Sequence, residues 1–201
     1  MPGVVRGSHE RIAGNSGAHP LCYDYLMSGL SLLVLLLAQT PKPPPVAGMP
    51  AADGVYYRLG YGQWQKLTPA PMADMKTKGM GTFIETEGLT NIGMDVVYKG
   101  PRAAVQISDR LPSLYVRGTG PANDVVLVQL TQRKDSRSVH ASSAAATLEN
   151  KGGFRKADIR KVTTTIYTDG SFSVTPEEDL KPGEYLLAFG YATAGYDFGI
   201  E

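Results

Sequence analysis

The chain has 201 residues, a net charge of +1 and a single cysteine, Cys22. From Met49 onward 17 basic residues balance 17 acidic ones, so charge does not direct this part of the chain toward nucleic acid or an anionic membrane. The same part contains no cysteine, which excludes disulfides, a cysteine nucleophile and cysteine metal ligands there. Its length suits one domain with a sizeable core.

The first feature along the chain is an apolar run from Leu30 to Ala38 that carries no charge. A proline-rich stretch, residues 40–46, follows it at once. This order is typical of a secretory signal, so we expect a signal peptide or a membrane-anchor helix over residues 27–40. The rest of the chain would then be exported, to the periplasm or to the outside of the cell.

Two translation starts remain open for this N-terminal segment, residues 1–40. A start at Met1 gives a mostly apolar segment, residues 21–38, which is near the minimum length of a spanning helix and contains Asp24. A start at Met27 leaves residues 1–26 as a disordered extension instead of the charged flank of a signal. Cleavage near residues 46–51 would release the body, whereas an uncleaved head would be its contact with the membrane.

Residues 41–53 read as a proline-rich linker and residues 54–201 as one domain of short alternating runs broken by Gly, Pro and Asp. This pattern predicts an all-β fold, in which the spacing of the runs favours a sandwich. A first hairpin is expected where two such runs flank a turn with two glycines. Its strands are residues 55–59 and 63–67, and further strands are expected at residues 82–87, 94–98, 103–108 and 113–117.

The second half of the domain begins with residues 125–130, which are apolar on both faces. A strand of this kind needs cover on each side, so we expect it at the centre of the core. The polar run after this strand, residues 131–137, would carry the hairpin into solvent, with a turn near Asp135 and Ser136.

Turn residues separate the last expected strands of the chain. Asp169-Gly170 is a type I′ signal and predicts that residues 162–168 pair with residues 172–175. Pro182 and Gly183 stand at the central positions of an expected type II turn before an apolar strand. That strand spans residues 185–189, and residues 196–200 form the last one.

Four short segments carry a resemblance to known proteins. They are Gly54-Val-Tyr-Tyr57, Gln63-Trp64, Leu180-Lys-Pro-Gly-Glu-Tyr185 and Tyr196-Asp-Phe-Gly-Ile200. In this order they resemble a group of exported bacterial proteins of unknown function. The resemblance covers most of residues 54–201 and implies export and an immunoglobulin-like antiparallel β-sandwich, but it brings no catalytic residues.

Side chains suited to catalysis are scarce in the body. His140 is its one histidine, and no Gly-x-Ser-x-Gly elbow is present. His140 begins a stretch with weak helical character, residues 140–150, and we predict that it is a solvated loop histidine. Clustered His or Cys metal sites are excluded by count. Carboxylates at Glu85 and Glu87, or at residues 177–179, would be needed for calcium, but exposed solubilising charges fit them better. We therefore predict no enzyme, no metal and no cofactor.

Aromatic side chains in the first hairpin are the candidates for binding. Tyr57, Tyr61 and Trp64 would offer rings to a sugar or to a partner's side chain if they face outward. A basic concentration in the middle of the body is predicted to be a solvated face, because acidic residues are interspersed and hairpin ends are normally charged. It consists of Arg133, Lys134, Arg137, Lys151, Arg155, Lys156, Arg160 and Lys161.

These observations favour an exported, non-enzymatic module with a structural or binding role at the cell envelope. Its partner would be an envelope protein or a glycan, and not nucleic acid. A carbohydrate-binding module that uses the Tyr61 and Trp64 hairpin is the alternative within binding proteins. A small envelope hydrolase built on paired carboxylates is the alternative from another class, although few aromatic residues cluster near acids in this chain.

Overall fold

A computed structural model of the chain describes residues 40–78, 93–142, 153–190 and 194–201. The chain divides into two compact units, residues 1–41 and 42–201, and every described strand belongs to the second. The expected head, residues 1–26 and 27–40, lies outside the described residues except for Thr40, as does the strand expected at residues 82–87. No helix in the described part is long and apolar enough to cross a membrane.

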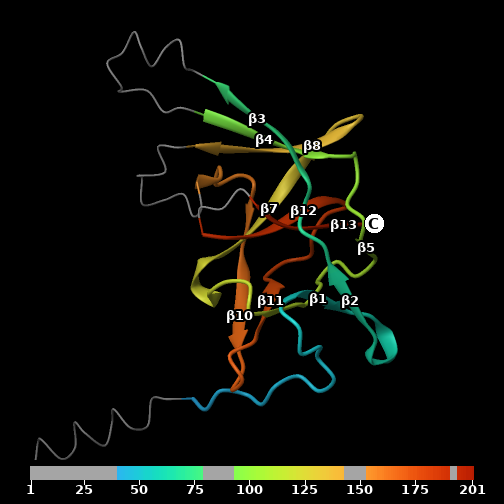
Figure 1. Ribbon diagram of the computed structural model, residues 1–201, viewed down its shortest axis with the longest axis vertical. Helices are drawn as coiled ribbons and strands as arrows, with labels where there is room; N and C mark the ends of the chain where they lie inside the picture. Colours follow the sequence, from blue (N-terminus) through green and yellow to red (C-terminus); the bar gives the residue numbers. More distant parts are fainter. Residues whose placement is uncertain (1–39, 79–92, 143–152, 191–193) are drawn as a thin grey trace, which may run out of the picture. The chain divides into compact units, whose positions relative to one another are not determined.

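The second unit is all-β, as the alternating pattern predicted (Figure 1). A smaller sheet has the strand order β10-β11-β6-β1-β2 and is antiparallel throughout. Its strands are β10 (Val162–Ile166), β11 (Phe172–Pro176), β6 (Leu114–Arg117), β1 (Gly54–Arg58) and β2 (Trp64–Leu67).

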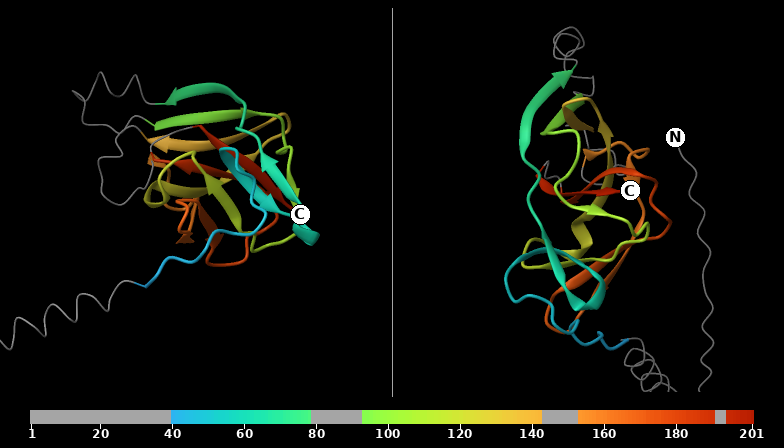
Figure 2. Two further views of the ribbon diagram at one scale, coloured as in Figure 1. Left: turned by 60° about the horizontal axis from the view of Figure 1, so that its bottom comes forward. Right: turned by 90° about the vertical axis from the view of Figure 1, so that its right-hand side faces the viewer.

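A larger, mixed sheet has the order β3-β4-β8-β7-β12-β13-β5, and β9 pairs beside β7. Its one parallel pair joins β13 to β5. The strands are β3 (Met72–Lys78), β4 (Gly93–Lys99), β8 (Ser136–Ser142), β7 (Val125–Gln132), β12 (Gly183–Phe189), β13 (Gly195–Ile200), β5 (Gln106–Ile107) and β9 (Ile159–Arg160). Figure 2 shows β3 and β4 at one end of this unit and the β1–β2 hairpin at the other.

The first hairpin forms as expected, with Val55 opposite Leu67 and Arg58 opposite Trp64. A short 3₁₀ turn, η1 (Gly60–Gly62), closes it, and Gly62 has the positive φ of +78° that glycine tolerates. A second such turn, η2 (Ala122–Asp124), precedes β7. The strand expected over residues 103–108 is reduced to β5, and β3 was not foreseen at all.

Two expected turns differ from the structure. β10 and β11 pair as predicted, but the Tyr167 N–H donates to the Ser171 carbonyl and leaves a three-residue loop, one longer than type I′ allows. At Pro182-Gly183 the chain does not make a type II turn, because Gly183 has φ +153° instead of about +80°. In its place the Tyr185 hydroxyl donates to the Lys181 carbonyl at 2.7 Å.

The first core lies between the two sheets. Its side chains come from both, which is why inward residues alternate with outward ones along β6 and β11. The smaller sheet contributes Val55, Leu67, Leu114, Val116, Phe172 and Val174; the larger contributes Ile107, Val125, Leu127, Tyr185, Leu187, Phe198 and Ile200; Leu180 joins them from a loop.

A second core covers the opposite face of β7 and β12. β8 pairs with β7 only at Thr131 and Gln132, and β9 takes the same edge at Leu127 and Val128. The second core consists of Ala70, Val96, Tyr98, Val126, Val128, Leu130, Val139, Ala141, Phe154, Leu186 and Ala188. Residues 125–130 are therefore buried on both faces, as their composition predicted.

The proline-rich segment expected as a linker belongs to the compact unit from Lys42 onward. The Thr168 N–H donates to the Pro43 carbonyl at 3.0 Å, and the Tyr56 hydroxyl donates to the Ala52 carbonyl at 2.8 Å. Lys66 Nζ donates to the carbonyl of Asp53 at 2.8 Å. These bonds hold the segment against the smaller sheet and its hairpin.

Candidate functional site

The aromatic candidates of the first hairpin are engaged by the chain itself. Trp64 meets Tyr115 edge to face, with ring centroids 5.0 Å apart, and the Arg58 guanidinium carbon lies 5.7 Å from the Trp64 centroid. Tyr57 packs against the first core, and burial, with Asp109 nearby, raises the pKa of its hydroxyl. The side chain of Tyr61 lies outside the described part of the structure.

One polar atom of Trp64 stands out. Its indole Nε1 is buried and has no hydrogen-bond partner in the structure. A Cβ added at Gly48 would lie 3.8 Å from that nitrogen, so the segment before β1 passes beside the indole edge. An unpartnered buried donor costs about 1–3 kcal/mol.

A buried ionic cluster joins four strands of the larger sheet. Arg137 of β8 is 1% exposed and donates through Nη1 to Asp197 Oδ2 of β13, while Glu184 Oε2 of β12 lies 3.5 Å from the same nitrogen. Asp197 and Glu184 are each 3% exposed. The prediction of a solvated Arg137 is therefore wrong, because this side chain is buried together with two carboxylates.

Backbone groups complete this cluster. Arg137 donates to the carbonyls of Lys99 at 2.8 Å and Gly100 at 3.1 Å, at the end of β4. Glu184 accepts the Ala103 N–H at 2.6 Å. Charges taken out of water are stable only when paired and hydrogen-bonded, and here the contacts are all internal. They fasten the segment between β4 and β5 to the larger sheet.

Tyr98 lies beside this cluster and is fully buried. Burial raises the pKa of its hydroxyl, Asp197 adds to the rise, and Arg137 opposes it. The phenol therefore stays protonated at neutral pH.

His140 is also placed differently from its prediction. It lies in β8, opposite Asp95 of β4, and its Nδ1 is 2.8 Å from Asp95 Oδ1. The pair is partly buried, with 28% and 14% of the two side chains exposed. His140 is thus a strand residue in a cross-strand pair, and not a loop histidine; residues 143–150, the rest of the stretch with helical character, lie outside the described residues.

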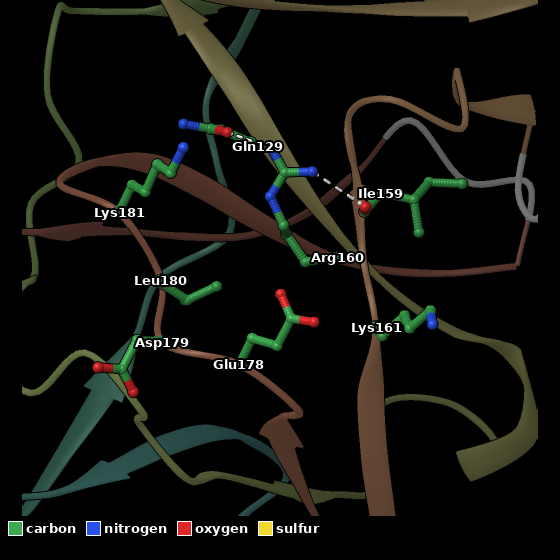
Figure 3. A pocket seen from close by; sticks show the side chains of 8 residues that line it. All are labelled: Gln129, Ile159, Arg160, Lys161, Glu178, Asp179, Leu180 and Lys181. Carbon is green, nitrogen blue, oxygen red and sulfur yellow. Dashed lines mark hydrogen bonds between the residues drawn. The ribbon is translucent and has the colours of Figure 1, made fainter.

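A pocket of about 410 Å³ opens between β7, β9 and the loop that joins β11 to β12 (Figure 3). This volume is within the range of small-molecule sites. Three cations, two carboxylates, one amide and two apolar side chains surround it. They are Arg160, Lys161, Lys181, Glu178, Asp179, Gln129, Ile159 and Leu180.

Arg160 is held firmly at one side of this pocket. Its Nη1 donates to the carbonyls of Ala157 at 2.8 Å and Ile159 at 3.1 Å, and its Nη2 donates to Gln129 Oε1. Burial raises the pKa of the Tyr185 hydroxyl, while the charge and a hydrogen bond of Arg160 oppose that rise. Among the described residues the guanidinium therefore faces neutral oxygens, and no carboxylate there neutralises it.

A second, smaller pocket of about 240 Å³ adjoins the first, because both are lined by Ile159, Arg160 and Lys161. Within the described ranges no group of three or more His, Cys, Asp or Glu residues could hold a metal ion. Residues 177–179 lie in the β11–β12 loop, whereas Glu85 and Glu87 lie outside the described residues.

The chain matches no protein-family model, no curated protein and no solved structure.

Sequence reasoning missed the ionic cluster and the pocket. In residues 136–142, Arg137 alternates in step with Val139 and Ala141, which marks it as sharing the buried face. That signal was available from the sequence. The pocket had no comparable signal, since its residues come from three distant segments.

Proposed function

We propose that the chain is an exported, non-enzymatic module with a structural or binding role at the cell envelope. One observation carries the non-enzymatic part of the proposal. The buried charged side chains, Arg137, Asp197 and Glu184, bond to one another and to backbone, and none of them lines the pocket of Figure 3. Glu184 alone of the three borders another cavity, an open one of about 430 Å³ beside Arg102 and Glu201. Arg137 and Asp197 line none of these pockets, whereas charged groups in an active site face a space where substrate can lie.

An immunoglobulin-like sandwich is part of the proposal. The order β10-β11-β6-β1 corresponds to strands D-E-B-A of that fold, and β8-β7-β12-β13 corresponds to C′-C-F-G. On this assignment β2, β3, β4 and β5 are additions at the sheet edges, and β9 is an addition beside β7.

The hydroxyl of Tyr185 supports the same assignment. It lies near the start of β12 and bonds to the Lys181 carbonyl four residues upstream. A tyrosine that bonds back in this way near the start of strand F is a hallmark of the immunoglobulin fold.

Export rests on the apolar run of residues 30–38, which the structure does not describe. The test is to fractionate the native cells and to sequence the amino terminus of the protein found in each fraction. A soluble form beginning near residues 47–52, or a full-length form in washed membranes, would support export. A soluble, uncleaved form in the cytoplasm would overturn it.

A carbohydrate-binding hairpin is the second candidate, favoured by the unpartnered Nε1 of Trp64. A sugar hydroxyl could accept from this nitrogen once the segment at Gly48 moves aside. Trp64→Phe keeps an aromatic ring and removes the donor, so a binding module should lose glycan affinity on a glycan array and remain folded. Unchanged glycan binding, or none in the natural protein, would contradict this candidate.

A further inference from the structure

Several arginines of the unit pair with carboxylates, whereas, among the described residues, four exposed charged side chains around the pocket of Figure 3 do not. Arg102, Arg117 and Arg155 each pair with a carboxylate. The side chains of Glu178, Asp179, Lys161 and Lys181, in contrast, make no hydrogen bond or ion pair anywhere in the described part of the chain. Two cations and two anions without partners there thus surround one cavity.

Donors gather at one side of this cavity. Because the Oε1 of Gln129 accepts from Arg160, the amide nitrogen of Gln129 is directed away from the guanidinium. Figure 3 shows this nitrogen and the ammonium group of Lys181 on the same side of the pocket. Together they would hold a carboxylate through a charge-assisted hydrogen bond and a neutral one.

An acceptor stands at the other side. The carboxylate of Glu178 points into the pocket, below Arg160, in Figure 3. Within the described residues no ion pair joins Glu178 to Arg160, so its oxygens are open to a ligand's ammonium group. Leu180 and Ile159 also line the pocket and offer apolar contact.

We propose that this pocket binds a zwitterion of about dipeptide size, with its carboxylate at Lys181 and Gln129 and its ammonium group at Glu178. A simple anion would meet Glu178 and Asp179, and a simple cation would meet Arg160, Lys161 and Lys181. Like charges brought together cost binding energy, so the mixed lining disfavours both. A ligand with one charge of each sign at opposite ends satisfies both sides.

This inference rests on the proposed binding role. The test is an NMR titration of the full chain with alanyl-leucine, with N-acetyl-alanyl-leucine and with alanyl-leucine amide. The first carries both charges, the second lacks the ammonium group, and the third lacks the carboxylate. We expect the free dipeptide to bind about tenfold more tightly than either capped form, a difference of about 1.4 kcal/mol, because each capped form loses one charge-assisted hydrogen bond.

Two variants test which end of the dipeptide Lys181 and Glu178 each bind. Lys181→Gln should remove the preference for the free dipeptide over the amide, and Glu178→Gln should remove the preference over the acetylated form. Lys134→Gln and Asp135→Asn, which remove exposed charges at the β7–β8 turn, are the matched controls and should change neither preference.

Equal affinity for the three ligands, or no saturable binding, would overturn the site. So would variants that behave like the controls. Cleavage of the dipeptide is a separate outcome, visible in the same spectra as free alanine and leucine. It would overturn the non-enzymatic role, while the pattern of preferences would still decide the site.

Discussion

Two arginines flank β7, and they are used in opposite ways. Arg137 is 1% exposed and its guanidinium lies against two buried carboxylates. Arg160 is half-buried and bonds to two carbonyls and an amide, all of them neutral. The positive charge of Arg137 is neutralised inside the fold, whereas that of Arg160 remains at the edge of a pocket.

The difference shows where this chain keeps charge for contacts with other molecules. A buried ion pair organises the strands around it, but its charges are not available to a ligand. A guanidinium held by neutral acceptors is equally well positioned and still attracts anions. On this basis the β9 side of the molecule is the better candidate for binding, and the Arg137 cluster is structural.

The largest expected effect is that of Arg137→Ala. The substitution leaves Asp197 and Glu184 buried without their cation, which costs about 3–5 kcal/mol. Chemical denaturation of the full chain would measure it as a lower unfolding midpoint. Arg133→Ala, at the exposed end of the same hairpin, is the control and should cost under about 0.5 kcal/mol. Equal losses for the two variants would contradict the structural role of Arg137.

Arg160→Ala should cost less, about 1–2 kcal/mol, because the acceptors that it releases are neutral and half-exposed to water. The same denaturation experiment checks this value. A loss as large as that of Arg137→Ala would erase the contrast between the two arginines.

How far the sequence predicts these two regions depends on how local their signals are. Alternation and turn glycines lie within a few residues of one another, so the all-β class and the hairpins of Gly62 and Asp169 were predictable. The burial of both faces of residues 125–130 was also predictable, because a strand that is apolar on both sides needs cover on each.

Partners distant in the sequence were not predictable. Arg137 and Asp197 are 60 residues apart in the sequence, and in the sheet β7 and β12 lie between their strands, so only the folded topology brings them together. The basic cluster of the sequence divides for the same reason: Arg137 turns inward and Arg160 lines a pocket. Two basic residues that belong to the same basic part of the sequence can thus be placed differently by the fold, one buried in an ion pair and the other beside a pocket.

Tyr185→Phe tests the hydrogen bond that closes the loop before β12, on the Arg160 side of the molecule. It removes the hydroxyl that bonds to the Lys181 carbonyl, and the expected loss is about 1 kcal/mol. The ring still stacks on Phe198, with centroids 5.7 Å apart, so the first core is kept. If the corner also positions Lys181 for a ligand, the variant should weaken dipeptide binding in the NMR titration. Unchanged stability would show that the corner bond contributes nothing.

The smallest expected effect concerns a third arginine, Arg117, which pairs at the surface with Asp169 at 2.7 Å. A hydrogen bond from Ser171, with Arg117 adding to it, lowers the pKa of Asp169 below its ordinary value of 3.8. A carboxyl whose pKa is lower in the folded state stabilises the fold above its unfolded pKa, and this contribution is lost as pH falls through the folded value. The natural protein should therefore be slightly more stable than Asp169→Asn at neutral pH, and the difference should shrink below about pH 4. Urea midpoints across this range would show it. A difference that persists in strong acid would mean that Asp169 acts through the geometry of the β10–β11 turn and not through its charge.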